Sequence, residues 1–505
     1  MERISHGALL LDDNQPAPNQ PASPVPAGNV ACPPRTKFDY LFPNNSTDRL
    51  PDRDAKRRPM AETLIRLGNS MIDSGVAGLD SGIPSAYTYF GQFITHEIVL
   101  EVTTKGTKLG PDTRPLDKAV IPTLENARTT VLDLDSVYAP RLDSHGLCYP
   151  VPRKGDEMVL GVAGNGDKFR DFDLKREIDP PFAALIGDRR NDSNLIASQL
   201  HLAFLRAHNA LIQQGKSQGK SFADAQKLLR QHFQWLVMSD YLPWVVDGDV
   251  LNSVRKGEID VFKWARNRSC MPVEFSAAAF RFAHSMPKNV YHYNKIHDVA
   301  ELSELFLPIP QYSRLLEAWI IDWEHFIPGG QNVARLIDTR LVQPLFRLID
   351  STGKPVFDSK SQPIGLAALD LLRGYLLGLP TGQAVARHLG EPAISEQEIE
   401  NAAGKFVQDQ IAADQKAILA DSGLSTHTPL WFYILAEAAV QKNGDCLGRV
   451  GSTIVAGVLI EMISRSTDSI LHDPNWQGPT LGNGNFDLAE LFKLAGVLPA
   501  PTKKN

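Results

Sequence analysis

Two polar side chains, an amide and an imidazole, lie four residues apart in an apolar segment. Residues 90–97 read Phe-Gly-Gln-Phe-Ile-Thr-His-Glu, and their apolar members predict a largely buried helix. Helical geometry would put Gln92 and His96 on one face, where an amide and an imidazole point into the same space. A lone helical histidine is usually a packed or surface residue, but a buried imidazole needs a partner. We therefore interpret this pair as part of a reactive pocket.

A second kind of chemistry is suggested by Glu97 and by the loop at residues 129–138. Alternate residues of an extended loop project towards one point, and here these are Thr129, Val131, Asp133 and Asp135. Ca²⁺ takes about six to eight hard oxygen ligands, and Glu97 could complete such a shell. The same pattern also fits a polar loop with an Asx turn, and from the residues alone both interpretations stay open.

Two consecutive arginines, Arg189 and Arg190, follow Gly-Asp and precede an apolar helical pattern. In one interpretation they are solvated charges before a helix that is capped by Asp192 or Ser193. In the other, one guanidinium enters a pocket and stabilises developing negative charge.

A single imidazole, His284, lies in a stretch of small and aromatic residues at 275–286. It is either a core histidine or an axial ligand to haem iron, because imidazole is the usual proximal donor. Such a ligand needs an acceptor for its other nitrogen. Asp370 is a candidate, because an acid inside an apolar helix also needs a partner.

The composition is that of a globular protein, with 505 residues, 43% of them hydrophobic, and a formal net charge of −6. This charge argues against a nucleic-acid partner, because phosphate binding requires a basic face. No apolar run of about 18 residues predicts a membrane span, and the N-terminus lacks a secretory apolar core. We expect a cytoplasmic protein, with export by a route without a signal peptide as the alternative. The cysteines are far apart and form no CxxC pair, so we expect them all to be reduced: Cys32, Cys148, Cys270 and Cys446.

Helical spacing of apolar residues predicts a mainly α protein with few short strands. The candidate helices, after residues 90–97, are 194–214, 226–246, 366–377, 396–420, 430–442 and 447–464. Residues 103–128 and 140–190 carry many glycines or prolines and predict long loops. The Pro-rich residues 1–60 predict an extended N-terminal arm. We expect one large catalytic domain over residues 61–505.

Together these segments resemble the animal-type haem peroxidases of the peroxidase–cyclooxygenase superfamily, and most closely their bacterial members. The resemblance extends from about Tyr87 to about Ser464. In chain order, the matching segments are similar to the distal helix (91–97), the calcium loop (129–138), the distal-arginine segment (187–190) with its following helix (202–209), the proximal FRxxH motif (280–284) and the segment beside the proximal histidine (369–374). Each motif alone is moderate evidence, but five in family order identify the chain as a member.

The resemblance implies a role for each matched residue. His96 would be the distal general base, and Gln92 the amide that orients water or halide. Arg190 would be the distal arginine, since it falls second after Asp188. His284 would be the proximal iron ligand. The other haem contacts implied, near the propionates, the distal arginine network or the proximal imidazole, are Arg281, Asp370 and Arg373. The implied calcium ligands are Glu97, Thr129, Val131, Asp133 and Asp135.

Departures from the family pattern predict how this member differs. Mammalian relatives attach haem by esters from carboxylates at the positions of Thr95 and Ser193, so we expect non-covalent haem b here. Asp370 replaces the usual Asn, and a carboxylate makes the proximal imidazole a stronger donor. Both changes lower the reduction potential and predict poor chloride oxidation. Glu97 is longer than the usual Asp, which would weaken the calcium site or shift the distal helix.

The resemblance thus implies a peroxidase that uses H₂O₂, through an oxo-ferryl intermediate, to oxidise phenols, anilines, iodide, bromide or thiocyanate. One alternative is a fatty-acid dioxygenase of the same superfamily, in which a radical tyrosine precedes the proximal histidine by three residues; here that position is Arg281. Another is a haem- or calcium-binding protein without catalysis. A zinc site at His96 and Glu97 is disfavoured, because adjacent helical ligands diverge.

Overall fold

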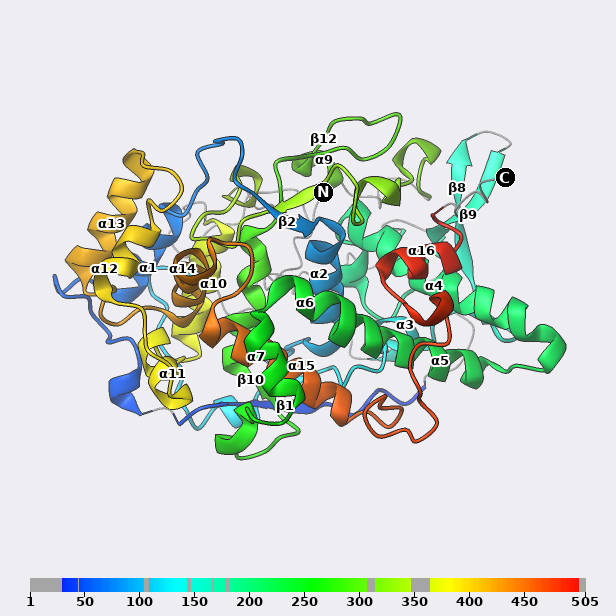
Figure 1. The fold of residues 1–505 in the computed structure, drawn as a ribbon, viewed down its shortest axis with the longest axis horizontal. Helices are drawn as coiled ribbons and strands as arrows, with labels where there is room; N and C mark the ends of the chain where they lie inside the picture. The colour runs from blue at the N-terminus through cyan, green and yellow to red at the C-terminus, as the bar shows by residue number, and fades with distance from the viewer. Residues whose placement is uncertain are drawn as a thin grey trace.

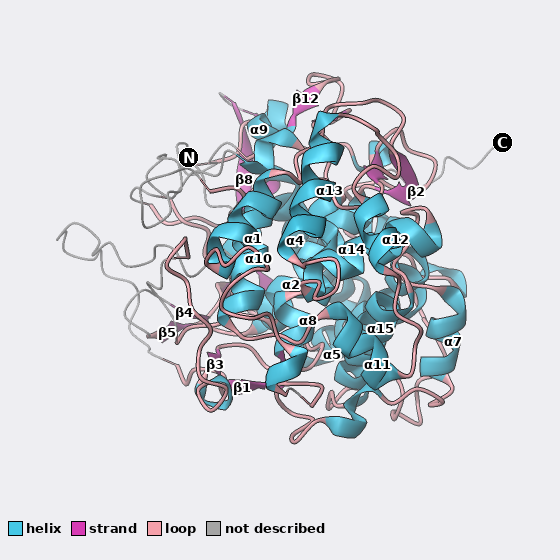
Figure 2. Cartoon of the chain, turned by 90° about the vertical axis from the view of Figure 1, so that its left-hand side faces the viewer, coloured by secondary structure: helices cyan, strands magenta, loops and turns pink. Residues whose placement is uncertain are grey.

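Helices build the body of the protein, and short strands lie at its edges (Figure 2). The computed structural model describes residues 30–498 except for 44, 104–108, 143–146, 166–167, 179–181, 307–313 and 347–363. Its α-helices are α1 Met60–Asn69, α2 Ala86–Ile98, α3 Asp135–Tyr138, α4 Leu195–Gly215, α5 Phe222–Trp235, α6 Leu242–Val245, α7 Gly248–Arg255, α8 Val273–Ala277, α9 Leu302–Leu305, α10 Leu366–Leu376, α11 Gly382–Leu389, α12 Glu396–Ala402, α13 Gln410–Ser422, α14 Leu430–Lys442, α15 Arg449–Ser464 and α16 Leu488–Leu494. The predicted mainly α architecture is confirmed.

The strands form small, separate sheets. The largest joins β1 Thr36–Asp39 in parallel to β10 Met271–Pro272 and antiparallel to β3 Glu125–Asn126. The antiparallel pairs are β2 Asp80–Pro84 with β13 Val333–Arg335, β4 Arg141–Leu142 with β5 Cys148–Tyr149, β6 Arg153–Lys154 with β7 Glu157–Met158, β8 Leu160–Asn165 with β9 Lys168–Leu174, and β11 Val290–Tyr291 with β12 Ala300–Glu301. Most of these strands are two residues long, which explains why periodicity gave so little strand signal.

Most helix predictions are confirmed, with instructive differences at the boundaries. The helix predicted at 194–214 is α4, but neither Asp192 nor Ser193 caps it. The cap is Asn194, whose side-chain oxygen accepts from the Ala197 N–H at 2.8 Å. The prediction at 396–420 splits into α12 and α13, because Asp409 starts a new helix by accepting from the backbone N–H of Ala412.

The helix predicted at 226–246 is longer and less regular than its pattern suggested. It begins as α5, passes through one π-helical segment, Leu236–Tyr241, and ends as α6. The π-helical segment places Tyr241 against α2. A Cβ added at Gly91 would lie 2.6 Å from the Tyr241 hydroxyl, so only glycine allows this close approach.

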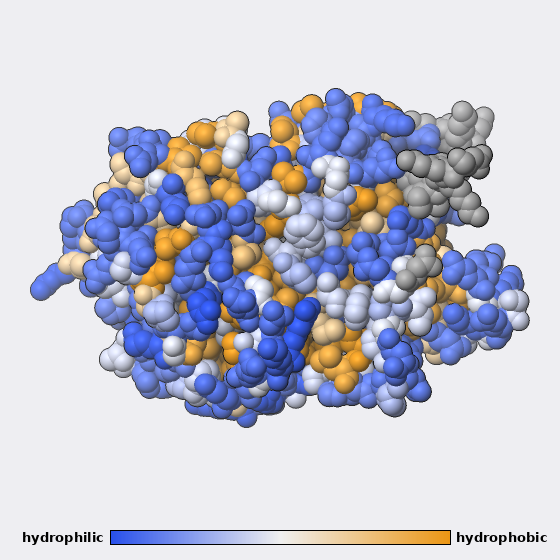
Figure 3. All heavy atoms as spheres, in the orientation of Figure 1, coloured by the Kyte–Doolittle hydropathy of each residue, from blue (hydrophilic) through white to orange (hydrophobic). Residues whose placement is uncertain are grey.

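The core surrounds α2, which lies near the middle of the molecule (Figure 1). In that view α1, α12 and α13 lie to the left, and α4, α5 and α16 to the right. Residues of α14 and α15 are buried on all sides, as their nearly continuous apolar sequences require. The surface mixes hydrophilic and hydrophobic patches (Figure 3). Within the described residues, none of the helices combines the length and apolarity needed to span a membrane.

The predicted loops and arm lie partly outside the described residues. Residues 104–108, 143–146, 166–167 and 179–181 of the two loops, and residues 1–29 and 44 of the arm, are not described. The described loop residues include the hairpin β8–β9. In the arm, β1 is extended, but Phe38 within it and Phe42 just after it are buried in the core. The domain boundary at residue 60 stays a prediction.

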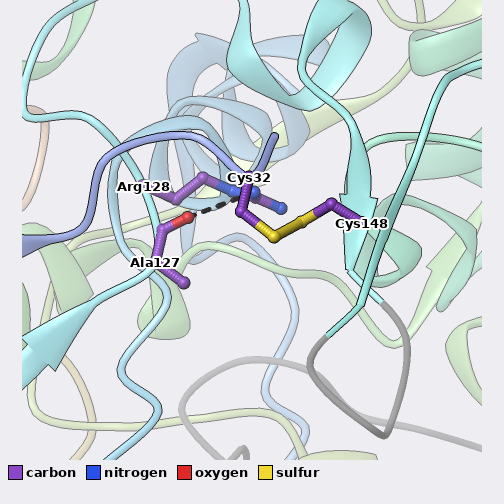
Figure 4. Close-up of a disulfide and its surroundings, with 4 residues drawn as sticks. All are labelled: Cys32, Ala127, Arg128 and Cys148. Atoms are coloured by element: carbon purple, nitrogen blue, oxygen red, sulfur yellow. Dashed lines mark hydrogen bonds between the residues drawn. A yellow bond between two sulfur atoms is a disulfide. The ribbon is translucent and has the colours of Figure 1, made fainter. Parts of the chain in front are cut away.

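The expectation of four reduced cysteines is wrong. Cys32 and Cys148 form a disulfide across 116 residues of sequence, with their Cα atoms 5.3 Å apart (Figure 4). Cys270 and Cys446 are free. The bond ties the arm to β5, and the Val30 N–H donates to the Cys148 carbonyl beside it. Disulfides persist mainly in oxidising compartments. The cytoplasmic location stays a prediction, but the expectation of reduced cysteines no longer supports it.

Candidate functional site

A cavity with about 630 Å³ of space not filled by protein atoms, part of it open to solvent, separates α2 from the segment that follows α8. One wall is α2, which contributes Thr88, Tyr89, Gly91, Gln92 and Thr95. The opposite wall is the 3₁₀ segment Ala279–Ser285, which contributes Phe280, Arg281, Ala283 and His284. The two segments predicted to hold the site therefore face one another across one cavity.

His284 is held by a buried acid of α10. Its Nδ1 lies 2.5 Å from Oδ2 of Asp370, which α10 brings in from 86 residues away. Arg281 donates to the other carboxylate oxygen of Asp370 at 2.8 Å. Burial alone would raise the pKa of Asp370, but His284 and Arg281 outweigh it and lower the pKa. Asp370 is therefore ionised, and its carboxylate can fix the orientation of the His284 imidazole.

A second cavity adjoins the first at Arg281 and is lined by a second arginine, Arg373. Burial and the nearby charge of Arg281 lower the pKa of Arg373 to about 9. Two arginines close together in a buried place favour an anion between or beside them. The predicted site residues Arg281 and Arg373 are thus brought together at the edge of the main cavity.

His96 is fully buried on α2, and its Nδ1 lies 2.8 Å from the side-chain oxygen of Asn191. The Asn191 nitrogen lies 3.0 Å from Nδ1 of a second buried histidine, His201. An amide oxygen only accepts, so His96 must carry its proton on Nδ1 and leave Nε2 as a base. Burial, followed by the charge of Arg190, lowers the pKa of His96 to about 3. His96 is therefore a neutral imidazole at physiological pH.

Gln92 lines the cavity, as predicted, and its side-chain oxygen accepts from Asn194 at 3.3 Å. His96 does not contribute to the cavity lining, although it lies one helical turn further along α2. The structure thus brings Gln92, Arg281 and His284 to one cavity, with His96 behind its wall.

The prediction that the Arg190 guanidinium enters the cavity does not match its position. Arg190 is buried and donates to both oxygens of Asp188, at 2.9 and 2.6 Å. It also donates to the backbone carbonyls of His96 and Val99, at 3.0 and 2.6 Å. These carbonyls end α2, where they lack partners within the helix and attract a cation. Arg190 therefore positions the end of α2 in this structure.

The calcium ligand set is only partly assembled. Glu97 is fully buried and accepts from the backbone N–H groups of Asp135 and Ser136. Oδ2 of Asp135 accepts from the Thr129 hydroxyl at 2.5 Å. Asp133 points elsewhere and accepts from the Ser466 hydroxyl, and Val131 has no side-chain oxygen to offer. Burial and the nearby Asp135 raise the pKa of Glu97 to about 8. Among the described residues, no cluster of three His, Cys, Asp or Glu side chains is arranged to hold a metal ion.

Several residues that support this site were not singled out from the sequence. Arg128 donates to Asp188 at 2.6 Å and to the His96 carbonyl at 3.3 Å, so two arginines share one buried carboxylate. Asn191, the partner of His96, directly follows Arg190 and could have been found by extending that motif. Arg128 lies just before the proposed calcium loop, and the residues around it give no indication that it contacts Asp188.

Comparisons with known proteins agree with this geometry. The model of the family described as animal haem peroxidase matches residues 123–416. A search of curated protein sequences found no match.

Solved structures with the same fold include an amoebal peroxidase and a plant dioxygenase. Peroxidase A from Dictyostelium discoideum is 17% identical, with a TM-score of 0.56, and the match covers 92% of this chain and 94% of that chain. The fatty acid alpha-dioxygenase of Oryza sativa is 13% identical, with a TM-score of 0.51 and coverage of 79% and 71%. A Tyr-to-Phe variant of that dioxygenase, solved with palmitic acid, is 12% identical, with a TM-score of 0.54 and coverage of 81% and 74%.

Proposed function

Because the chain belongs to the animal haem peroxidase family, we propose that it is a haem peroxidase that uses H₂O₂ to oxidise small donors such as phenols, anilines, iodide, bromide or thiocyanate. One observation carries the proposal. A single cavity has Gln92 on one wall and, on the other, His284 with its Nδ1 held by the ionised Asp370. This is the arrangement that an axial ligand and a reaction pocket require.

The residues of the cavity fit a haem group. His284 would be the iron ligand through Nε2, and Asp370 would fix its orientation and strengthen its donation. The propionates would find Arg281 and Arg373, which both line the adjoining cavity. When bound, haem supplies an iron centre that binds peroxide and takes up its oxidising equivalents.

Non-covalent attachment is part of the proposal. Thr95 lines the cavity and donates to the Gly91 carbonyl at 3.0 Å, and Ser193 is buried nearby on the segment before α4. Neither side chain can form an ester as a carboxylate would. Acid-acetone extraction should therefore remove the haem from the protein.

Proton transfer would be the task of His96. Its Nε2 would accept a proton from peroxide in the cavity and return a proton to the oxygen that departs as water. Asn191 holds the tautomer that this needs, and burial keeps the imidazole neutral. Because His96 lies behind the cavity wall, we propose that the transfer runs through one water held by Gln92. Arg190 and Arg128 fix the end of α2 and so the position of His96.

Calcium is a further part of the proposal, limited to Glu97, Thr129 and Asp135. Two buried carboxylates lie close enough for Asp135 to raise the pKa of Glu97. A divalent cation would remove this repulsion and let both acids ionise. Asp133 would have to leave Ser466 to join them.

The test is a pair of assays on haem-loaded protein. With H₂O₂, we expect turnover of iodide and of a simple phenol, and chloride oxidation that is far slower. Absence of both iodide and phenol turnover from protein with a full haem complement would reject the proposal.

The alternative of a fatty-acid dioxygenase is favoured only by the shared fold with the rice enzyme. Arg281, which pairs with Asp370, occupies the position where the family's dioxygenases have the radical tyrosine. Oxygen consumption with palmitate, measured without added peroxide, distinguishes the two activities. We expect none.

A further inference from the structure

A row of aromatic rings runs from the cavity wall to the surface. Tyr89 lines the cavity, and its ring centroid is 6.1 Å from that of Tyr291. Tyr291 stacks on Phe326 at 5.8 Å, and Phe326 meets Tyr293 at 6.3 Å. Tyr293 in turn is 6.0 Å from Trp319. Each ring therefore contacts the next.

The outer end of the row is held firmly. The Tyr293 hydroxyl donates to the backbone carbonyl of Trp319 at 2.8 Å. The amide of Asn294 donates to the carbonyls on both sides of Trp319, each at 2.8 Å. The Trp319 indole stacks on His297, with centroids 3.8 Å apart and an angle of 11° between the planes. Because these rings are held in fixed contact, an electron can pass between them without a diffusive encounter.

Trp319 is half-buried, whereas Tyr89, Tyr291 and Tyr293 are buried. The segment around its stacking partner, residues 290–299, exposes three large apolar side chains: Val290, Ile296 and Val299, at 44%, 68% and 63%. Exposed apolar side chains that gather in one segment offer contact area to an aromatic molecule. A donor that cannot enter the cavity could therefore rest beside the indole.

We propose that Tyr89, Tyr291, Tyr293 and Trp319 relay electrons from a surface site at Trp319 to the cavity, so that phenolic donors too large for the cavity are oxidised at the surface. The inference rests on the proposed function, because peroxide reduction creates the demand for electrons. Each H₂O₂ takes two electrons and two protons and leaves as two waters. Two donor molecules each lose one electron and one proton at the surface, and become phenoxyl radicals.

The inner tyrosines are suited to carry charge without losing their protons to solvent. Tyr89 is fully buried, and burial together with the adjacent Tyr291 phenol raises its pKa well above the usual value. Tyr89 would give an electron and a proton towards the cavity, where peroxide reduction consumes both. Tyr291, whose ring adjoins that of Tyr89, would then supply the next electron together with a proton. Phe326 lies between Tyr291 and Tyr293 as a bridge and is not itself oxidised. Residues two apart in an extended segment are about 7 Å apart, a short step for an electron.

The first test compares donors of two sizes in haem-loaded protein. The probes are iodide, which enters the cavity, and phenol-substituted dextran, which is too large. Trp319→Phe and Tyr293→Phe should each lower dextran–phenol oxidation at least tenfold and leave iodide oxidation within twofold. The matched control is Trp476→Phe, since Trp476 is also half-buried and lies against a histidine, His232, with centroids 5.2 Å apart. It should change neither rate.

The second test needs no haem. Azide radicals made by pulse radiolysis oxidise exposed indoles, and an indolyl radical then takes an electron and a proton from a nearby tyrosine. In haem-free protein we expect an intramolecular conversion of indolyl to phenoxyl radical. Trp319→Phe and Tyr293→Phe should remove this phase, whereas Trp476→Phe should keep it.

The outcomes separate the two proposals. Dextran–phenol oxidation that persists in both relay variants, with iodide turnover intact, overturns the relay alone. A radical conversion that is unchanged in both variants overturns it as well. Wild-type protein that oxidises neither iodide nor dextran–phenol overturns the proposed function, and the relay with it.

Discussion

Nδ1 of His284 lies 2.5 Å from a carboxylate oxygen of Asp370, in a place where both side chains are buried. The carboxylate stays ionised because His284 and Arg281 together outweigh the effect of its burial on its pKa. A full negative charge on this side of the imidazole increases electron donation through Nε2. The electronic character of the proposed iron ligand is thus set by a residue on another helix.

Replacing Asp370 by Asn tests this relationship. Asp370→Asn keeps the shape and the hydrogen bond but removes the charge, so the reduction potential of the bound haem should rise. We expect a rise of about 60 mV or more, which is one tenfold change in a one-electron equilibrium. Spectroelectrochemical titration measures it. The matched control is Asp338→Asn, at a buried acid away from the cavity. An unchanged potential in Asp370→Asn would show that the carboxylate does not tune the ligand.

Removing the imidazole at position 96 should slow the reaction with peroxide without loss of haem. His96→Ala should lower the second-order rate with H₂O₂ by roughly 10²–10⁴, the usual contribution of a positioned base. Because the pKa of His96 is lowered to about 3, the wild-type rate should not fall through protonation of this residue between pH 7 and pH 4. Stopped-flow absorbance gives both results. A wild-type rate that falls with a midpoint near pH 6.5 would contradict the buried, neutral state.

The same buried histidines should make the protein sensitive to acid. Burial lowers the pKa of His96 and of His201 from the usual 6.5 to about 3. Between these values the unfolded chain binds more protons than the native protein, so the free energy of unfolding falls as pH falls. Each histidine contributes up to about 1.4 kcal/mol per pH unit in that window. Urea titrations at several pH values measure the slope. The free energy of unfolding should depend less steeply on pH in His201→Gln than in the wild type. An equal slope in the two proteins would show that His201 does not contribute to the acid sensitivity.

Calcium should stabilise the protein more at high pH than at low pH. The pKa of Glu97 is raised from the usual 4.5 to about 8. Without a cation, the free energy of unfolding therefore falls as pH rises through this range. A bound cation would cancel that loss. The rise in Tm on adding calcium should therefore be larger at pH 8 than at pH 5, and should vanish in Glu97→Gln. A rise that is the same at both pH values, or that survives in the variant, would exclude this site.

The disulfide should contribute strongly to stability. The bond between Cys32 and Cys148 closes a segment of 116 residues, and closing a loop of this length destabilises the unfolded chain by about 5 kcal/mol in the chain-entropy model. Cys32→Ser should lower the free energy of unfolding by about that amount, and reductant should then have no further effect. Cys270→Ser, at a free cysteine, is the control. Equal stability of the two variants would mean that the arm is held without the bond.

The parts of the site that the sequence predicted are those set by local geometry or by the cost of burying charge. Gln92 lines the cavity and His96, one turn away, is buried behind its wall, because a helix of this composition must bury both side chains. His284 and Asp370 are far apart in sequence, but each was a buried polar group in need of a partner. The helices 430–442 and 447–464 are nearly continuous apolar runs and could be placed closely.

The parts that could not be predicted depend on tertiary contacts. The motif singled out Arg190 but did not reveal that Asp188 and the carbonyls at the end of α2 bind its guanidinium. Sequence spacing carries no information on which two cysteines meet across 116 residues. Asp133 belongs to an alternating pattern, but Ser466 holds its side chain away from Glu97.

The absorbance spectrum of His284→Ala, recorded with and without added imidazole, tests the central claim most directly. Wild-type protein titrated with haem should develop the Soret band of a histidine-bound iron, and acid-acetone should remove it. In His284→Ala this band should be lost or displaced, and imidazole should restore it by filling the space that the side chain left. A His284→Ala protein that binds haem with the wild-type spectrum in the absence of imidazole would contradict the account.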